Sequence, residues 1–380
     1  LLLPLALLCL AAMIKSAQLP FQKWLLGAMV APTPVSALLH ASTMVNAGAY
    51  LVLRFSPAIT GGRVGVALAM LGAVSFAATA ALAIGKRNAK KILAFSTISN
   101  LGLIFACAGL ASPEAAAIGF ALLLQHAVSK GLLFLCIGNF EQHLERRDLE
   151  TMRGLAIALP VTGIIAIIAI LALILPPFGM LLGKWLLLES GAANLTFFIL
   201  LVVGNGCTLL YWMRLTGTLI TGAAGVPVLR ESKIGFIHIP QIILCLAVFV
   251  LSALAPQLFF WSGQAMASLW EKAGIVAAGL TAGPVRASSF PFLPLLLVAL
   301  VFAIWALAAV RAALRTGPVA PYLAGANASE EGASFVGPMN HFVQSQLGNY
   351  YLTGTFGNRL GFWCNTAAWL LLALLFGSVL

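Results

Sequence analysis

The stretch that decides the fold is KSAQLPFQKWLLGAMVAPTPVSALLHASTMV, residues 15–45. It is mostly apolar, yet it begins with Lys15, contains His40 and is interrupted by Pro20. Proline has no amide hydrogen and clashes with the preceding turn, so a helix through this stretch is expected to break at Pro20. Broken backbone at membrane depth is tolerated only against protein or a water-filled cavity. The stretch therefore predicts a broken membrane helix.

The composition of the whole chain agrees with a membrane protein. The chain has 380 residues, of which 61% are hydrophobic and 8% are charged, whereas soluble domains are about 25% charged. The net charge of +11 comes from bases scattered through short loops, which argues against a nucleic-acid partner. The six cysteines stand singly in apolar runs, and this spacing is typical of small buried hydrophobic residues rather than metal ligands.

A bilayer core requires roughly 20 apolar residues per helix, and on this criterion the sequence contains ten candidate spans. The sixth span is too long for one straight helix and contains Pro176 and Pro177, so it is expected to break as the first does. We therefore expect an all-α membrane fold, a polytopic bundle of about ten transmembrane helices with two broken helices. The spans are 1–31 (broken), 35–53, 64–85, 92–110, 115–139, 155–188 (broken), 194–213, 237–261, 290–310 and 361–380.

The lysines and arginines of alternate loops predict the orientation. One side carries thirteen of them and the other carries four, namely Arg54, Arg63, Lys272 and Arg286. Because cytoplasmic loops carry the positive excess, the first side is expected to face the cytoplasm, together with the long polar loop 316–360. The thirteen are Lys86, Arg87, Lys90, Lys91, Arg146, Arg147, Arg153, Arg214, Arg230, Lys233, Arg311, Arg315 and Arg359.

Three lysines fall inside apolar spans: Lys15, Lys130 and Lys184. A lysine at the bilayer centre costs roughly 2.5–3.5 kcal/mol on insertion scales, so such residues are functional candidates. Burial favours the neutral amine, which allows a lysine to pass a proton onward where an arginine would not. The alternatives are snorkelling to an interface or a static ion pair, for which Glu189 is the nearest acid to Lys184. Gly131, directly after Lys130, predicts a weak point in that helix.

Two histidines lie near these lysines or near a helix break. His126 precedes Lys130 by four residues, so the two share one helix face. His40 is expected about 9 Å into its helix at 1.5 Å per residue. A histidine titrates near neutral pH, which suits a proton relay, but a hydrogen-bonded structural role is the other interpretation. His40 belongs to a mostly polar stripe with Ser36, Thr43 and either Ala47 or Asn46.

The chain lacks the motifs of redox and nucleotide chemistry. Its sequence contains no phosphate-binding glycine-rich loop, no haem or iron–sulfur cysteine set and no nucleophile elbow. We therefore expect neither redox chemistry nor ATP hydrolysis in this chain. If it pumps, another subunit supplies the driving force.

Three blocks of sequence resemble a known family. They are KSAQLPFQKWLLGAMVAPTPVSALLHASTMVNAGAYLVLR, KKILAFSTISNLGLIFACAGL and HAVSKGLLFLCIGNF. They resemble the antiporter-like membrane subunits of respiratory complex I, the L, M and N type of NADH-quinone oxidoreductase. Energy-converting hydrogenases, formate hydrogenlyase and multisubunit Na⁺/H⁺ antiporters share this family. The resemblance runs from residue 1 to about residue 190.

The resemblance implies a fold of two inverted five-helix repeats, each with a broken helix near the membrane centre. Residues 1–54 would be the last two helices of the first repeat, 64–213 the second repeat, and 214–380 further C-terminal helices. The chain would then lack earlier helices, including the one whose glutamate pairs with the first lysine. The positions that match the family's proton-translocating residues are Lys15, His40, Lys90, His126, Lys130 and Lys184.

The implied function is proton translocation by one membrane subunit of a redox-driven complex I-like pump, either an NADH-quinone oxidoreductase or an energy-converting hydrogenase. The chain would bind no cofactor, with Fe–S, flavin or NiFe centres in partner subunits. Its partners would be other antiporter-like subunits, a peripheral redox arm and the lipid of a bacterial or archaeal cytoplasmic membrane. Two alternatives remain open: a subunit of a multisubunit Na⁺/H⁺ antiporter, and a scaffold subunit that does not transport.

Overall fold

The computed structural model describes residues 2–59, 62–110, 112–175, 178–221, 235–273, 297, 301, 334–336, 342–344 and 351–377. Nearly all of these residues are helical, apart from two short antiparallel strands, β1 (Ser334–Val336) and β2 (Phe342–Gln344). The helices are α1 (Leu2–Lys15), α2 (Lys23–Gly27), η1 (Ala28–Val30), α3 (Thr33–Ala37), η2 (Leu38–Ser42), α4 (Met44–Ile59), α5 (Arg63–Ile84), α6 (Ala89–Gly109), α7 (Pro113–Leu144), η3 (Leu149–Met152), α8 (Leu155–Ala158), α9 (Pro160–Ile174), α10 (Gly179–Gly191), α11 (Leu195–Ile220), α12 (His238–Ala253), α13 (Ala255–Lys272), α15 (Thr353–Phe356) and α16 (Asn358–Gly377).

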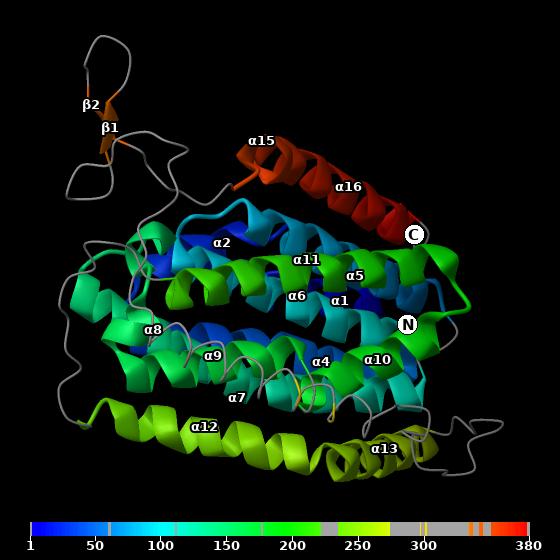
Figure 1. Cartoon of the computed structure of the whole chain (residues 1–380). Coiled ribbons are helices and arrows are strands. Elements are labelled where there is room, and N and C mark those ends of the chain that lie inside the picture. Colours follow the sequence, from blue (N-terminus) through cyan, green and yellow to red (C-terminus); the bar gives the residue numbers. More distant parts are fainter. Residues whose placement is uncertain are drawn as a thin grey trace.

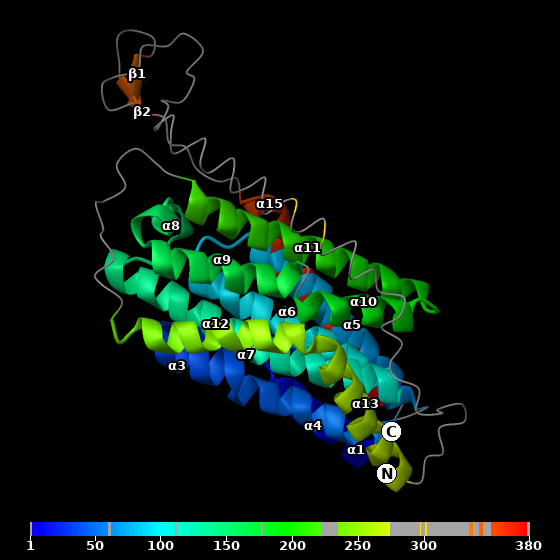
Figure 2. The same ribbon diagram turned by 60° about the horizontal axis from the view of Figure 1, so that its bottom comes forward.

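Helices α6 and α7 form the centre of the bundle. Helix α7 packs against α6 on one side and against α12 and α13 on the other, while α6 also packs against α5 and α4 (Figure 1). Figure 2 shows α1 and α4 side by side along one edge of the bundle, where they are in contact. Every residue of α6 except Lys91 is buried. Helix α6 therefore lies inside the bundle, with neighbouring helices on every side.

Among the described residues, six helices are long and apolar enough to cross a membrane, and a bent pair brings the number up to seven. The six are Thr33–Ile59, Arg63–Ile84, Ala89–Gly109, Pro113–Leu144, Pro160–Gly191 and Leu195–Ile220. Helix α1 and the 20-residue α16 correspond to the first and last expected spans. The expected span 290–310 lies outside the described residues. The prediction of a mainly helical, polytopic membrane fold is confirmed.

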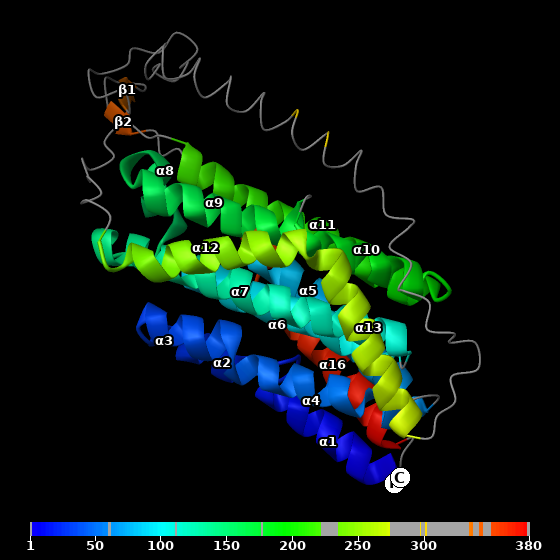
Figure 3. The ribbon, with the colours of Figure 1, turned by 90° about the horizontal axis from the view of Figure 1, so that it is seen from below.

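The expected span 237–261 contains a bend that the sequence did not predict. Helices α12 and α13 form one bent pair with an angle of 72° between them (Figure 3). The break falls at Leu254, where Pro256 occupies the first turn of α13. Proline is well tolerated there but offers no amide hydrogen to continue the preceding helix.

The two expected helix breaks are present. Helix α1 ends at Lys15 and α2 begins at Lys23, while α9 ends at Ile174 and α10 begins at Gly179. The first break is held by hydrogen bonds from Ser16 Oγ to the carbonyl of Val45, 2.7 Å, and from Gln18 Nε2 to the carbonyl of Ile98, 3.2 Å.

A weak point at Gly131 was expected and is absent, because α7 runs without interruption for 32 residues. Instead, the backbone is irregular at His40, where Leu38–Ser42 form a π-helix that ends at Thr43. The extra residue in this turn changes the helical register, so Ser36, His40 and Asn46 are buried while Thr43 is exposed. The expected four-residue polar stripe is therefore only partly formed.

The basic loops meet at one end of the bundle, as the alternation of charges predicted. Asn88 forms a β-bridge with Asp148, and the amide of Gly154 donates to the carbonyl of Thr218. Arg214 donates to the carbonyls of Ile84 and Lys86. These contacts join the loops after α5, after α7 and at the end of α11, and we call this side of the bundle the basic end.

Tyr351 ties the C-terminal segment to the basic end. Its hydroxyl donates to Glu150 Oε1 at 2.5 Å, and its ring lies 5.0 Å from the guanidinium of Arg87 and 4.7 Å from that of Arg214. Burial, followed by the Glu150 carboxylate, raises the pKa of the Tyr351 hydroxyl, so it stays protonated and remains a donor at neutral pH.

Replacing Tyr351 with phenylalanine should lower the free energy of unfolding by about 1.5–3 kcal/mol, because a hydrogen bond to a charged group contributes about that much. Tyr351→Ala should cost more, since the contacts of the ring with both arginines are also lost. The midpoint of thermal unfolding in detergent measures both effects. The control is Tyr50→Phe, because Tyr50 accepts only an exposed hydrogen bond from Arg54. Equal stability of Tyr351→Ala and the unaltered protein would contradict this role.

Candidate functional site

Lys130 lies near the middle of α7 and is completely buried. Its amine donates to Ser96 Oγ of α6 and lies 4.4 Å from the centre of the Trp212 ring of α11. Within the described ranges no carboxylate contacts this amine. Three helices thus enclose one lysine amine and supply it with a hydroxyl and an aromatic face.

These two contacts are of the right size to keep Lys130 buried. Placing a lysine at the bilayer centre costs roughly 2.5–3.5 kcal/mol. A hydrogen bond from a charged donor returns about 1.5–3 kcal/mol, and a desolvated cation–π contact about 2 kcal/mol. The hydroxyl of Ser96 and the ring of Trp212 therefore offset most of the cost of burying this amine.

His126 lies one turn before Lys130 on the same face of α7 and is also completely buried. Neither of its ring nitrogens has a hydrogen-bond partner among the described residues, and the same holds for both amide atoms of Gln125. The Gln125 amide lies against Gly179, the first residue of α10. The polar face of α7 therefore continues from Lys130 toward the second helix break.

The π-helix that contains His40 lies beside the same part of α7. Ser42 Oγ donates to the carbonyl of Ala127 at 3.0 Å, and Gly131 leaves room for Ser42, which would lie 2.8 Å from a Cβ atom added there. His40 itself is 5% exposed, with its Nδ1 unpaired among the described residues. A π-turn of this kind is frequent at functional sites. The structure thus brings His40, His126 and Lys130 into neighbouring segments.

Lys184 lies in the first half of α10 and is buried. Its amine donates to the carbonyl of Leu173 at 3.2 Å, across the second break. The last four carbonyls of a helix have no donor within the helix and carry partial negative charge, so the Lys184 amine caps the end of α9. The Glu189 side chain is exposed, and the hydrogen bond of the lysine goes to the carbonyl instead. Lys184 is within electrostatic range of Lys130 and His126.

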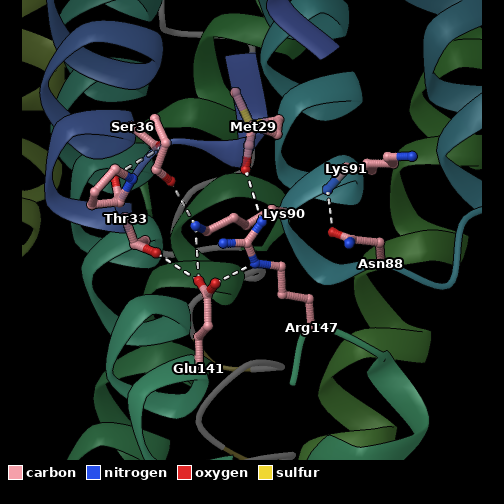
Figure 4. A network of polar contacts seen from close by, with 10 residues as sticks. Met29, Thr33, Ser36, Asn88, Lys90, Lys91, Glu141 and Arg147 are labelled. Atoms are coloured by element: carbon pink, nitrogen blue, oxygen red, sulfur yellow. Dashed lines mark hydrogen bonds and ion pairs between the residues drawn. The ribbon is translucent and has the colours of Figure 1, made fainter. Parts of the chain in front are cut away.

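Lys90 opens α6 at the basic end and is 1% exposed. Its amine lies 2.8 Å from Glu141 Oε2 and donates to the carbonyl of Ala31 at 3.0 Å (Figure 4). Lys90 was predicted among the basic loop residues and, from the resemblance, among the proton-translocating positions, whereas Glu141 was not singled out. A carboxylate in an apolar helix is as rare as a lysine, and this rarity was the signal for Glu141.

Lys15 is the exception among the expected site residues. It is the last residue of α1 and its side chain is exposed in the described structure. Helix α1 buries Ala6, Cys9 and Met13 against the bundle, and at 3.6 residues per turn Lys15 projects from a different face. In the described structure, the helices therefore do not enclose Lys15 as they enclose Lys130 and Lys184.

Two further residues of the site, Ser96 and Trp212, contact Lys130 from other helices. Ser96 is a polar residue in an apolar span, where a serine usually makes an ordinary helix–helix hydrogen bond. Trp212 gave no signal in the sequence, because a tryptophan in a membrane helix is ordinary. Among the described residues, no group of His, Cys, Asp and Glu is placed to hold a metal ion. The arrangement is suited to moving protons between amines, imidazoles and hydroxyls.

A family model described as "NADH:quinone oxidoreductase/Mrp antiporter, TM" matches residues 1–209 of the chain. This match contains all six expected site residues. It also covers α1 to the middle of α11, which includes Ser96 but not Trp212.

Curated relatives carry the names of complex I subunits. NADH-ubiquinone oxidoreductase chain 5 of Aedes aegypti is 38% identical over 221 residues, which is 57% of this chain and 38% of that protein. NADH-quinone oxidoreductase subunit L of Campylobacter jejuni is 42% identical over 217 residues, 55% of this chain and 35% of that protein. The aligned part of the chain thus spans little more than a third of the length of these relatives.

Two solved structures share the fold. The Mrp complex from Dietzia sp. DQ12-45-1b matches with a TM-score of 0.61 and 27% identity, covering 82% of this chain and 38% of that one. The membrane-bound sulfane sulfur reductase, an archaeal respiratory membrane complex, matches with a TM-score of 0.65 and 22% identity, covering 73% of this chain and 57% of that one. At 22% identity, the match to the sulfane sulfur reductase shows a shared fold and nothing more.

Proposed function

Because the chain belongs to the NADH:quinone oxidoreductase/Mrp antiporter transmembrane family, we propose that it is a proton-translocating membrane subunit of a redox-driven, complex I-like assembly. It is a multi-pass integral membrane protein. The observation that carries the proposal is Lys130, which is completely buried, contacts no carboxylate among the described residues, and is bonded to one hydroxyl and one ring. Such an amine can lose and regain its proton at modest cost.

The proposed route runs through the buried groups around α6 and α7. A proton enters at the basic end near Lys90, reaches Lys130 beside Ser96, and leaves past His126 toward Lys184. Buried polar atoms need hydrogen bonds, and water is their ordinary partner where protein offers none. Buried side-chain atoms without a hydrogen-bond partner among the described residues lie along this route, at Asn100, Gln125, His126, Tyr211 and Trp212. His40 borders the route, whereas the exposed Lys15 is not included in it.

Several finer features belong to the same proposal. Residues 1–54 would end a first inverted repeat, residues 64–213 would form the second, and residues 214–380 would follow as further helices and the loop 316–360. Other antiporter-like membrane subunits would lie beside the chain, and a peripheral arm with Fe–S, flavin or NiFe centres would supply energy. The membrane would be the cytoplasmic membrane of a bacterium or archaeon, with the basic end toward the cytoplasm by the positive-inside rule.

Coupling to such an arm is an energetic requirement. Moving one charge against 100 mV costs about 2.3 kcal/mol, and the chain has no sequence motif for a reaction that yields this energy. Purification of the native complex in mild detergent, with mass spectrometry and assays for nickel, iron and flavin, identifies the arm. Electron-donor-dependent proton uptake by vesicles containing that complex would support the proposal. A complex of membrane subunits alone, without redox centres, would contradict it.

The alternative is a subunit of a multisubunit Na⁺/H⁺ antiporter, which the similarity to the Dietzia Mrp complex favours. In that case a gradient would drive the exchange and no electron donor would be needed. Sodium-dependent proton flux in vesicles without any donor distinguishes this function from the first. A scaffold subunit would show neither flux, and its variants would change assembly alone.

A further inference from the structure

The Glu141 carboxylate at the basic end is held between two cations. Its Oε2 lies 2.8 Å from the Lys90 amine and accepts from Thr33 Oγ1 at 2.7 Å, while its Oε1 accepts from Arg147 Nε (Figure 4). In the described structure, the charged groups in contact with it are thus Lys90 from α6 and Arg147 from the loop after α7. Helix α3 contributes only the neutral hydroxyl of Thr33.

The three charged groups differ in exposure in a regular order. Lys90 is 1% exposed, Glu141 16% and Arg147 38%. One carboxylate serves two cations, so either cation can leave while the other stays paired. Of the two cations, only Arg147 is exposed enough to reach water. Because an arginine remains charged whether paired or in water, turning its side chain outward costs little free energy.

Both cations also bond to one backbone segment. Lys90 donates to the carbonyl of Ala31, and Arg147 Nη1 donates to that of Met29 at 3.4 Å. The carbonyls of Met29 and Ala31 lie within and directly after the short helix η1, where backbone donors are lacking. Glu141 therefore fixes two cations at the end of the first broken span, at the mouth of the proposed route.

A path leads inward from this cluster. Lys90 and Ser96 are six residues apart on α6, or about 9 Å along a helix, and Ser96 accepts from Lys130. Glu141 and Lys130 are eleven residues apart on α7, about 16 Å along the helix. The cluster thus lies about half a bilayer core from the central lysine, on the side of the basic loops.

We propose that Glu141 takes up protons from the basic end and that Arg147 is a latch on its carboxylate. This rests on the function proposed above. With Arg147 in contact, Glu141 stays ionised. With Arg147 turned to water, a water-borne proton binds Glu141 Oε1. Lys90 passes its own proton inward and becomes neutral, and the proton of Glu141 then moves to the Lys90 amine. The ion pair is restored, and one proton has moved inward.

The first test is Glu141→Gln in the intact complex, assayed for donor-driven proton uptake by vesicles. Glutamine keeps the hydrogen bond with Thr33 but neither charge nor exchangeable proton, so uptake should fall roughly a hundredfold, the usual effect of losing a positioned proton-transfer group. Glu141→Asp should recover part of the uptake. The control is Glu145→Gln, which changes an exposed carboxylate at the same end. Uptake at the unaltered rate in an assembled Glu141→Gln complex would overturn the proposal.

The second test is Arg147→Gln, with Arg146→Gln as its exposed neighbour and control. Removing one cation makes the carboxylate easier to protonate, so uptake should persist to higher pH, with the alkaline limb of the rate profile shifted upward by about one unit. A merely structural arginine would leave the limb in place, and an unshifted limb would overturn the latch. The pH profile of Arg147→Gln tests the latch even if the Glu141→Gln complex does not assemble.

The same vesicles separate this proposal from the function on which it rests. If Lys130→Ala abolishes uptake while Glu141→Gln pumps normally, the route stands and only the role of Glu141 fails. If both variants pump at the unaltered rate, the translocation function itself fails.

Discussion

Replacing Lys130 with alanine is expected to abolish proton translocation while the complex still assembles. The variant removes the one buried amine that α6, α7 and α11 enclose together, and loss of a positioned proton-transfer group typically costs roughly 10²–10⁴-fold. Assembly should survive, because the variant removes a buried charge instead of leaving one unpaired. Donor-driven proton uptake in vesicles, normalised to assembled complex on native gels, is the measurement.

A second substitution separates charge from proton exchange. Lys130→Arg keeps a cation near Ser96 and Trp212, but an arginine does not give up its proton. It should therefore translocate as poorly as Lys130→Ala. The matched control is Lys91→Ala, which removes an exposed lysine from the neighbouring helix and should leave uptake unchanged. Pumping at the unaltered stoichiometry by either Lys130 variant would refute the proposed route.

The parts of the site that lie close in the sequence could be predicted from it. His126 and Lys130 share a face because helical periodicity alone places residues four apart together. The breaks near Pro20 and Pro176 follow from the chemistry of proline. The basic end follows from counting charges in alternate loops. Each of these inferences needs only the local geometry of the backbone or the count of lysines and arginines in the loops.

The partners of the buried lysines could not be predicted in the same way. Lys90 meets Glu141 across 51 positions of sequence, and Lys130 meets Trp212 across 82. Such pairs depend on how the helices pack, and no periodicity encodes that. The π-turn at His40 was missed because no proline lies within it. The bend at Leu254 was missed because Pro256 occupies the first turn of the next helix, where proline is ordinarily tolerated.

One pattern joins the buried cations to the irregular backbone. Lys90 and Lys184 each donate to a carbonyl at the end of a helix, and Trp24 Nε1 does the same for Ile14 at 3.0 Å. Helix ends inside a bilayer need such donors, since neither lipid nor the helix supplies them. Lys130 differs, because it bonds to a hydroxyl in an unbroken region. Capping of a helix end therefore does not explain why Lys130 is buried, whereas a role in proton exchange does.

The second large effect is expected at the contact between α5 and α6. A Cβ atom at Gly72 would lie 2.5 Å from the backbone nitrogen of Ala106 and 2.6 Å from the carbonyl oxygen of Gly102. At Gly109 it would lie 2.3 Å from the backbone nitrogen of Ala69. Small residues of this kind let membrane helices approach closely. Because the obstacles are backbone atoms, no rotamer change can relieve the overlap.

Gly72→Val should therefore force α5 and α6 apart and severely reduce the amount of assembled complex. The loss of stability should exceed the roughly 1–3 kcal/mol that an overpacked core typically costs. Proton translocation should be lost with it, since α6 carries Lys90 and Ser96 and sets the position of both. The measurement is the complex recovered from membranes on native gels. Gly206→Val is the control, because an added Cβ there meets no atom within 4 Å. Normal recovery of Gly72→Val would mean that α5 and α6 do not pack this closely, and the enclosure of Lys130 would need a different account.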